Sequence, residues 1–109
     1  MIIENSKVMP TTVGQGVERK ILAAEGSLMT VEVKFKKGAV GAVHTHPHEQ
    51  VSYIVQGSFE FELDGKKTVI KAGDSYYVNP EVPHGVTALE DSIIIDIFTP
   101  QREDFFPVN

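Results

Sequence analysis

Short runs of alternating apolar and polar residues, separated by glycine or proline every eight to twelve residues, dominate this sequence. The clearest run is 28–37 (LMTVEVKFKK), in which Val31, Val33 and Phe35 alternate with hydroxyl or charged side chains. A period of two places alternate side chains on opposite faces of a β-strand. Many short strands with regular turns are typical of sandwiches and barrels, and no ten-residue stretch has a helical period. We therefore predict an all-β fold.

Three further strand regions follow from local sequence. A hairpin is predicted over 57–71, because apolar and acidic residues alternate before Asp64-Gly65, a dipeptide that favours a type I′ turn. Segments 50–56 (QVSYIVQ) and 92–99 (SIIIDIFT) are rich in β-branched and aromatic residues, as buried strands are. The tail at 101–106 (QREDFF) fits either one helical turn or irregular chain.

Composition narrows the function classes. The 109 residues suit one domain spanning 1–109, and 41% apolar with 23% charged residues is a globular composition. The net charge of −5 argues against a nucleic-acid partner, and no apolar run is long enough to cross a membrane. The start carries Glu4 and lacks the apolar core of a secretory signal. We expect a soluble cytoplasmic protein, although the absence of cysteine fits a periplasmic one nearly as well.

All four histidines fall in two short segments. His44, His46 and His48 lie in GAVGAVHTHPHEQ, and His84 lies in NPEVPHG. Two histidines two residues apart on an extended chain point to the same side, so His44 and His46 can bind one ion, with His84 as a third ligand. The same residues can also form a solvated loop. A metal site is therefore one of two hypotheses at this point.

The spacing of these segments resembles that of the cupins, which are small antiparallel β-barrels of the jelly-roll type. The first cupin motif matches residues 38–57: Gly38, five residues, His44-Thr45-His46, three residues, Gln50, six residues, Gly57. The second matches less fully over 73–88, where Gly73 and His84 fit but Asn79, Glu81 and Ala88 replace the usual proline, glycine and asparagine. The resemblance implies a single-domain cupin.

The resemblance also implies a metal site. Its ligands would be His44, His46, Gln50 and His84, with glutamine where most cupins have glutamate. Glu49 competes with Gln50, but on a strand the two side chains point to opposite faces, and we favour Gln50. Pro47 breaks the alternation and leaves His48 outside the ligand set. The cofactor would be one divalent transition metal, and these ligands suit nickel, zinc, iron, manganese and copper alike.

A narrower resemblance involves nearly the whole chain, including HPHEQVSYIVQGSFEFELDGKK and IIIDIFTPQREDF. These runs are similar to the small pectin-degradation cupins of the KdgF type, which convert 4,5-unsaturated uronates to the open-chain keto form. Alternation alone favours Ile93, Ile95 and Ile97 toward the core and Asp96 outside. The resemblance instead places Asp96 inside the barrel as the acid/base.

The KdgF-type resemblance assigns two more residues. Phe98 lies two residues after Asp96, so both side chains point to the same face of the strand, and Phe98 would line the substrate pocket. Arg102 would act at the site mouth, where its guanidinium could bind a uronate carboxylate, or it could simply pair with Glu103 or Asp104 at the surface. The expected activity is a metal-dependent isomerisation of a small anionic sugar acid.

Two other classes of function stay open on the same fold. One is a metal-dependent dioxygenase or another sugar-acid isomerase, and the other is a non-catalytic small-molecule-binding cupin. Small cupins usually pair, so the resemblance also implies a homodimer.

Overall fold

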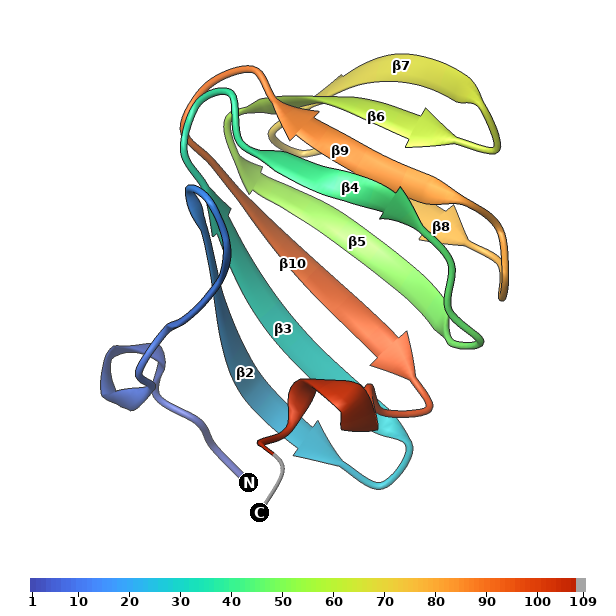
Figure 1. Cartoon of the computed structure of the whole chain (residues 1–109). Helices are drawn as coiled ribbons and strands as arrows, with labels where there is room; N and C mark the ends of the chain where they lie inside the picture. Colours follow the sequence, from blue (N-terminus) through green and yellow to red (C-terminus); the bar gives the residue numbers. More distant parts are fainter. Residues whose placement is uncertain (108–109) are drawn as a thin grey trace.

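A computed structural model describes residues 1–107 of the chain, and those residues form strands almost throughout (Figure 1). The expected range 1–109 extends two residues beyond them. The strands are β1 (Thr11–Gly14), β2 (Val17–Glu25), β3 (Leu28–Phe35), β4 (Val40–His44), β5 (Glu49–Gln56), β6 (Ser58–Leu63), β7 (Lys66–Lys71), β8 (Ser75–Val78), β9 (His84–Ala88) and β10 (Ser92–Thr99). Single 3-10 turns occur at η1 (Asn5–Lys7) and η2 (Glu103–Phe105). The predicted all-β fold is confirmed.

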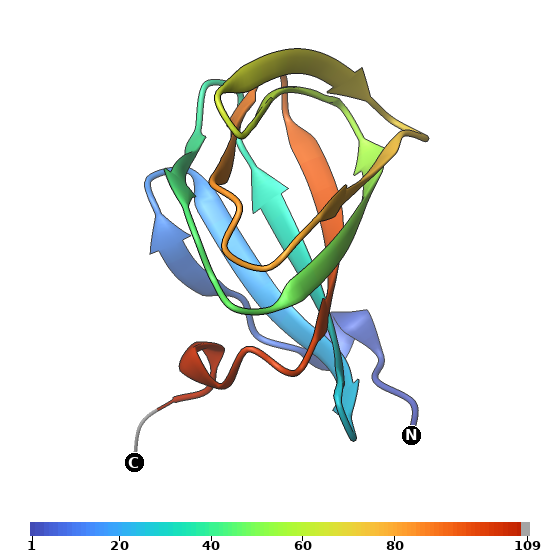
Figure 2. The same ribbon diagram turned by 90° about the vertical axis from the view of Figure 1, so that its right-hand side faces the viewer.

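The strands form two antiparallel sheets that face each other. The larger sheet has the order β1-β2-β3-β10-β5-β8, and the smaller has β4-β9-β6-β7. Because strands next to each other in a sheet come from distant parts of the chain, segments far apart in sequence meet, as in a jelly roll. Seen from the side, the sheets curve around a common interior and form a flattened barrel (Figure 2).

The predicted strands lie where the sequence placed them. In β3, Val31, Val33 and Phe35 are buried, as the alternation predicted. The hairpin β6–β7 turns at Asp64 and Gly65, whose φ values of 50° and 82° are the positive pair that a type I′ turn requires.

Gly57, at the end of the first cupin-like motif, is required for a different reason. Its φ is 83°, and an added Cβ would lie 2.0 Å from Ser92 Oγ and 2.7 Å from the Asp91 carbonyl oxygen. The chain passes too close to the start of β10 for any side chain here.

The barrel interior is apolar at one end and polar at the other. At the apolar end, the rings of Phe35 and Phe59 meet edge to face at 5.2 Å, and Ile54 and Ile94 pack in the same cluster. The tail makes a single 3-10 turn, η2, which brings Phe105 against the edge of that core. Among the described residues, no helix has the length and apolarity to cross a membrane.

Candidate metal centre

The three predicted histidine ligands converge at the polar end of the barrel. His44 ends β4 and His84 begins β9, and the two are direct partners in the ladder. His46 follows β4 in the connection to β5. One ring nitrogen of each of these histidines lies within 4.8 Å of the other two. The three nitrogens are therefore close enough to bind one metal ion between them. His46 and His84 are buried, whereas His44 is exposed.

Backbone carbonyl groups fix the orientation of all three imidazoles. Nδ1 of His44 donates to the Ala42 carbonyl at 2.9 Å, and Nδ1 of His84 donates to the Val82 carbonyl at 2.9 Å. Nδ1 of His46 contacts the carbonyl of His48 at 3.1 Å in the same way. A carbonyl only accepts, so each Nδ1 carries the proton and each Nε2 presents a lone pair, the arrangement in which imidazole binds metals.

Gln50 lies beside this cluster with its amide oriented by an acidic neighbour. Its Nε2 donates to Ser52 Oγ at 2.9 Å and to Asp96 Oδ1 at 3.3 Å, so its Oε1 faces His46. The distance from Gln50 Oε1 to His46 Nε2 is 2.9 Å. With the proton on Nδ1, both of these atoms are acceptors and repel each other. Two adjacent ligands of an ion bound at about 2.1 Å also lie about 3 Å apart, so a shared cation fits this pair.

Burial keeps the cluster in the form that binds metal. It lowers the pKa of His46, and it lowers the pKa of His84 to about 4, so both rings are neutral at pH 7. Nε2 of His84 is buried and has no hydrogen-bond partner in the described part of the chain. An unpaired buried acceptor is costly, and a cation among the three Nε2 atoms would satisfy it. These residues therefore fit a divalent metal.

The two competing candidates lie outside the cluster. Glu49 is exposed on the opposite face of β5 from Gln50, and its Oε1 accepts a hydrogen bond from the Tyr77 hydroxyl at 2.7 Å. His48 lies in the connection before β5, with its ring 5.4 Å from that of His46, and is not part of the three-histidine group.

Asp96 lies inside the barrel, on the same face of β10 as the buried Ile94 and Phe98. The outward orientation that alternation alone predicted for Asp96 is wrong. Ile93, Ile95 and Ile97 occupy the outer face instead, where Ile97 is 41% exposed. This strand is apolar on both faces, so its sequence does not reveal which face is inside.

Asp96 is held by two hydrogen bonds to one of its oxygens. Ser52, its ladder partner on β5, donates from Oγ to Oδ1 at 2.5 Å, and Gln50 donates to the same oxygen. Burial raises the pKa of this carboxyl to about 6, against the effect of Ser52 and of the Arg102 charge, which lower it. No hydrogen bond from residues 1–107 reaches Oδ2, so that oxygen is free to exchange a proton.

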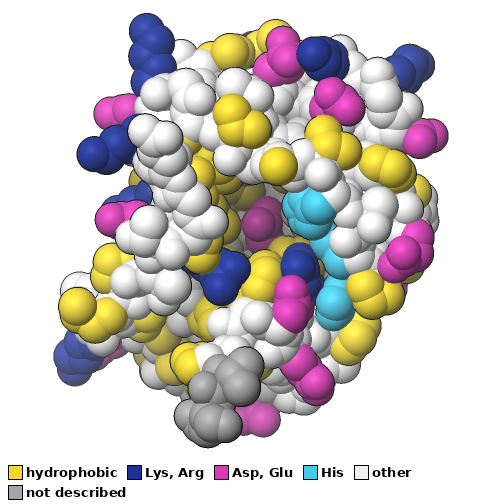
Figure 3. Space-filling view, viewed as in Figure 1, with side chains coloured by type: hydrophobic (Ala, Val, Ile, Leu, Met, Phe, Trp, Pro, Cys, Tyr) yellow, Lys and Arg dark blue, Asp and Glu magenta, His cyan; other side chains and the backbone are white. Residues whose placement is uncertain are grey.

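A cavity of about 150 Å³ connects Asp96 to the histidines. Phe98 and Tyr76 line it, and the Phe98 ring meets the His46 ring edge to face at 5.6 Å. Figure 3 shows the corresponding hollow, with histidine side chains along one wall, an acidic side chain at its floor and basic side chains at its rim. This volume is below the 300–1,000 Å³ typical of drug-sized ligands, so it suits a molecule of monosaccharide size.

Arg102 was expected either at the site mouth or in a surface pair with Glu103 or Asp104, and the structure shows features of both. It lines the cavity and is only 8% exposed, with its guanidinium 5.1 Å from the centre of the Phe98 ring. It also pairs with Asp104, donating from Nε to Oδ1 at 3.1 Å and from Nη2 to Oδ2 at 2.9 Å. Two of its donors are therefore engaged within the chain.

Sequence reasoning missed four residues of this site: Arg19, Ser52, Tyr76 and Phe105. The sequence does contain a signal for Arg19. It lies two residues from each of the apolar Val17 and Ile21 in β2, so the strand places all three side chains on the same face. A charged residue on the buried parity of a strand is uncommon and indicates a functional position. Ser52 and Tyr76 become recognisable only from the ladder that pairs them and pairs Ser52 with Asp96.

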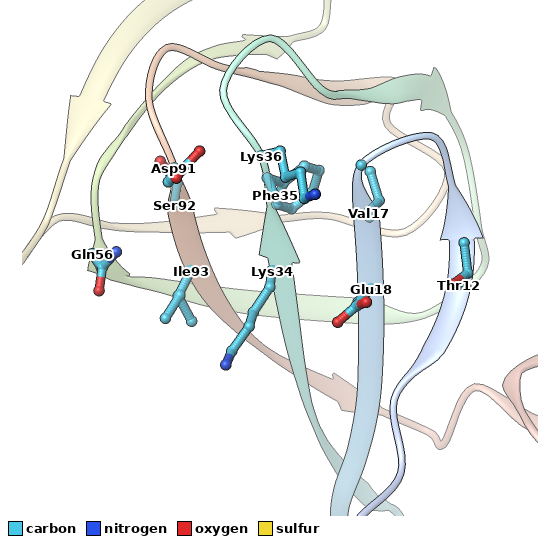
Figure 4. A pocket seen from close by; sticks show the side chains of 11 residues that line it. Thr12, Val17, Glu18, Lys34, Phe35, Lys36, Gln56, Asp91, Ser92 and Ile93 are labelled. Atoms are coloured by element: carbon cyan, nitrogen blue, oxygen red, sulfur yellow. The ribbon is translucent and has the colours of Figure 1, made fainter.

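A second depression, of about 520 Å³, lies on the outside of the larger sheet (Figure 4). Ile93, Lys34 and Glu18 are neighbours across three strands there and point to the same side. Among the described residues, no histidine lines this depression. It is separate from the metal centre.

Comparison with known proteins agrees with this geometry. The family profile described as "Cupin domain" matches residues 31–98. The pectin degradation protein KdgF of Dickeya dadantii is 45% identical over 94 residues, which cover 84% of this chain and 86% of that protein. The structure of KdgF from a Halomonas species superimposes with a TM-score of 0.93 at 42% identity, covering 97% of this chain and 98% of that one. An RmlC-like cupin from Shewanella frigidimarina has the same TM-score and identity, over 96% and 95% of the two chains.

Proposed function

The chain belongs to the cupin family, and from this premise we propose that it is a metal-dependent isomerase of 4,5-unsaturated uronate monosaccharides. Its product would be the linear keto form of the sugar acid. The relative from Dickeya dadantii, by its name, acts in pectin degradation, and the KdgF-type resemblance implies unsaturated uronates as the substrate. The observation that carries the proposal is Asp96: one interior carboxylate, with a free oxygen, in a small cavity that it shares with the histidine cluster.

In this proposal, His44, His46, Gln50 and His84 hold one divalent transition metal. When bound, the metal supplies Lewis-acid stabilisation of negative charge on a substrate oxygen. Three imidazoles and an amide are all neutral, so the ligands leave the charge of the ion uncompensated. The site therefore favours an anionic substrate or an anionic transition state.

The reaction needs one proton removed and one delivered. Oδ2 of Asp96 takes the proton of the anomeric hydroxyl, the bond from the anomeric carbon to the ring oxygen breaks, and the anomeric carbon becomes an aldehyde. The ring oxygen keeps the bonding electron pair and becomes the oxygen of an enolate. Return of the proton from Asp96 to the adjacent alkene carbon gives the ketone. No atom or electron is gained or lost, and proton transfer of this kind contributes about 10² to 10⁴ in rate.

The remaining residues position the carboxyl and the sugar ring. Ser52 and Gln50 bond Oδ1 of Asp96, which leaves Oδ2 directed to the substrate. Phe98 offers an apolar wall to the ring, and the Tyr76 hydroxyl, whose pKa is raised by burial and by Asp96, stays neutral.

The test is an assay with freshly released unsaturated uronate. Loss of the ultraviolet absorbance of its conjugated double bond is followed with wild-type protein, with chelator, and with Asp96→Asn. We expect acceleration over the spontaneous reaction for wild type, and none with chelator or with Asp96→Asn. Glu49→Gln, the same carboxyl-to-amide change outside the barrel, is expected to retain wild-type rate. Oxygen consumption during turnover would support the dioxygenase alternative instead, and a wild-type rate equal to the spontaneous rate would exclude the proposed activity.

We also propose that two copies pair through the outer face of the larger sheet. On β5, Val51, Tyr53 and Val55 are each about half exposed, and on β10 Ile97 lies beside Val51. The outward face of an antiparallel sheet is normally polar, and an exposed apolar patch of this kind marks an interaction surface. A second copy would bury the same patch on both partners.

A further inference from the structure

Arg19 is the one guanidinium at the cavity mouth that has no anionic partner among residues 1–107. It projects from β2 on the parity of the buried Val17 and lines the same cavity as Asp96 and His84. Its guanidinium carbon lies 3.8 Å from the centre of the Phe105 ring. None of the ion pairs or side-chain hydrogen bonds within that part of the chain involves it.

Arg102 lies close to Arg19 but, unlike Arg19, has an anionic partner. Its guanidinium carbon is 4.2 Å from the centre of the same Phe105 ring, so the two cations lie within about 8 Å of each other. Both carboxylate oxygens of Asp104 are engaged by Arg102. One acidic group thus faces two arginines, and a positive charge is left at the mouth of a cavity in an otherwise acidic protein.

The surroundings of Arg19 disfavour leaving that charge unpaired. Burial lowers the pKa of its guanidinium, the Arg102 charge lowers it further, and Asp104 offsets part of this effect. A guanidinium stays protonated, so the penalty is relieved only by an anion. A carboxylate is the planar anion whose two oxygens match the guanidinium donors.

We propose that Arg19 binds the carboxylate of the substrate. This inference rests on the proposed action on a sugar acid and deepens it, because it assigns the carboxylate to β2 rather than to the histidine cluster. In the larger sheet, β3 and β10 separate β2 from β5, so Asp96 lies between Arg19 and the Gln50 end of the cavity. A uronate held at Arg19 would have its ring beside Asp96 and its other oxygens toward the histidines.

Arg102 then has a different role from the one that the resemblance implies. With two donors committed to Asp104, it fixes the η2 turn and Phe105, on which Arg19 packs. It contributes charge to the mouth, whereas Arg19 contributes the free donors.

Binding of a sugar acid that cannot react tests this directly. Calorimetric titration compares D-galacturonate with neutral D-galactose, using protein that retains its metal and protein treated with chelator. We expect wild type to prefer galacturonate in both preparations, because Arg19 is no metal ligand. Arg19→Gln should lose about tenfold or more in galacturonate affinity, the size expected of a charge-assisted hydrogen-bond pair. Its weak affinity for galactose should stay unchanged.

Two matched variants separate the binding role from a general charge or folding effect. Arg19→Lys keeps the charge without the paired donors and should fall between wild type and Arg19→Gln. Lys34→Gln removes one positive charge from the outer face of the neighbouring strand, where Figure 4 shows Lys34 pointing away from the barrel, and should bind as wild type does. In the uronate assay, Arg19→Gln should raise KM by a similar factor and change kcat little.

The outcomes distinguish the two proposals. If the galacturonate preference disappears on chelation, or persists in Arg19→Gln and Arg19→Lys, the carboxylate binds elsewhere and Arg19 is excluded, whatever the enzyme does. If wild type shows the Arg19-dependent preference but does not accelerate loss of the unsaturated uronate, the isomerase assignment fails and the carboxylate site stands. A wild type with no preference at all also overturns the Arg19 proposal.

Discussion

The hydroxyl of Ser52 and the carboxylate of Asp96 face each other across the β5–β10 ladder, and Ser52 Oγ donates to Asp96 Oδ1 at 2.5 Å. This hydrogen bond lies inside the barrel, and Gln50, which is 46 residues before Asp96 in the chain, is the second donor to the same oxygen. It keeps one carboxylate oxygen occupied and leaves the other facing the cavity. An ionisable group held in this way has a cost in stability that can be measured.

We expect Asp96→Asn to stabilise the metal-free protein at pH 7. Burial raises the pKa of Asp96 from 3.8 to about 6, so the folded protein holds this proton more tightly than the unfolded chain does. The contribution of Asp96 to stability is therefore lost as pH rises from about 4 to about 6, and its full penalty above that range is about 2–3 kcal/mol. Urea unfolding with chelator should show the gain of Asp96→Asn at pH 7 and its disappearance near pH 4.

The outward carboxyl of Glu49 is the control for that measurement. Glu49→Gln removes a carboxyl from the same sheet at an exposed position and should give no comparable gain. The histidines also titrate in this range, so the comparison is between the two proteins at each pH: a difference in stability between wild type and Asp96→Asn that is the same at pH 4 and at pH 7 would show that burial of Asp96 carries no penalty.

Divalent metal should raise the melting temperature of the wild type and not of His84→Ala. A ligand that binds only the folded state raises the free energy of unfolding with the logarithm of the ratio of its concentration to Kd. A metal concentration one hundred times Kd adds about 2.7 kcal/mol. His84→Ala removes the Nε2 that is buried and unpaired among residues 1–107. Thermal unfolding of chelator-treated protein with added nickel or zinc measures the effect. His48→Ala, which removes an imidazole near but outside the cluster, should respond to metal as wild type does.

Glu81→Gly should stabilise the fold. Glu81 occupies the glycine position of the second motif and has a φ of 67°, which is unfavourable for a residue with a Cβ. Its backbone N–H donates to the His46 carbonyl at 2.8 Å, a bond that glycine retains. We expect a gain of about 1 kcal/mol in urea unfolding. Glu81→Ala keeps the Cβ while removing the charge and should give no gain; an equal gain in both variants would assign the effect to the charge instead.

A charge in the exposed apolar face of the larger sheet should separate the proposed dimer. Tyr53 is 49% exposed and pairs with Ile95 across the ladder, near the middle of that face. Tyr53→Lys should shift the mass measured by light scattering from two chains to one. Val69→Lys, on the exposed strand β7 of the other sheet, should leave the mass unchanged. A wild type that runs as one chain at high concentration would contradict the pairing.

Local sequence was sufficient to predict β3, β5, the β6–β7 hairpin with its Asp64-Gly65 turn, β10, and the opposite orientation of Glu49 and Gln50 in β5. Alternation in β3 and the dipeptide of the β6–β7 hairpin are local signals, because each depends only on the few residues that make the element. Likewise, Glu49 and Gln50 must point to opposite faces of any strand that contains them both, so the choice between them needed only the side on which the histidines lie.

The inward face of β10 and the position of Arg19 at the cavity mouth depend on contacts between distant segments. In SIIIDIFT both parities are apolar, so the position of Asp96 depends on the register of β10 with β3 and β5, which lie far away in the chain. The sequence offered Asp104 as a partner of Arg102, but only the packing of η2 against β2 brings Arg19 to the same Phe105 ring, without an anionic partner of its own among residues 1–107. The contact between Arg19 and Phe105 joins residues 86 positions apart, and no local pattern encodes a contact of that kind.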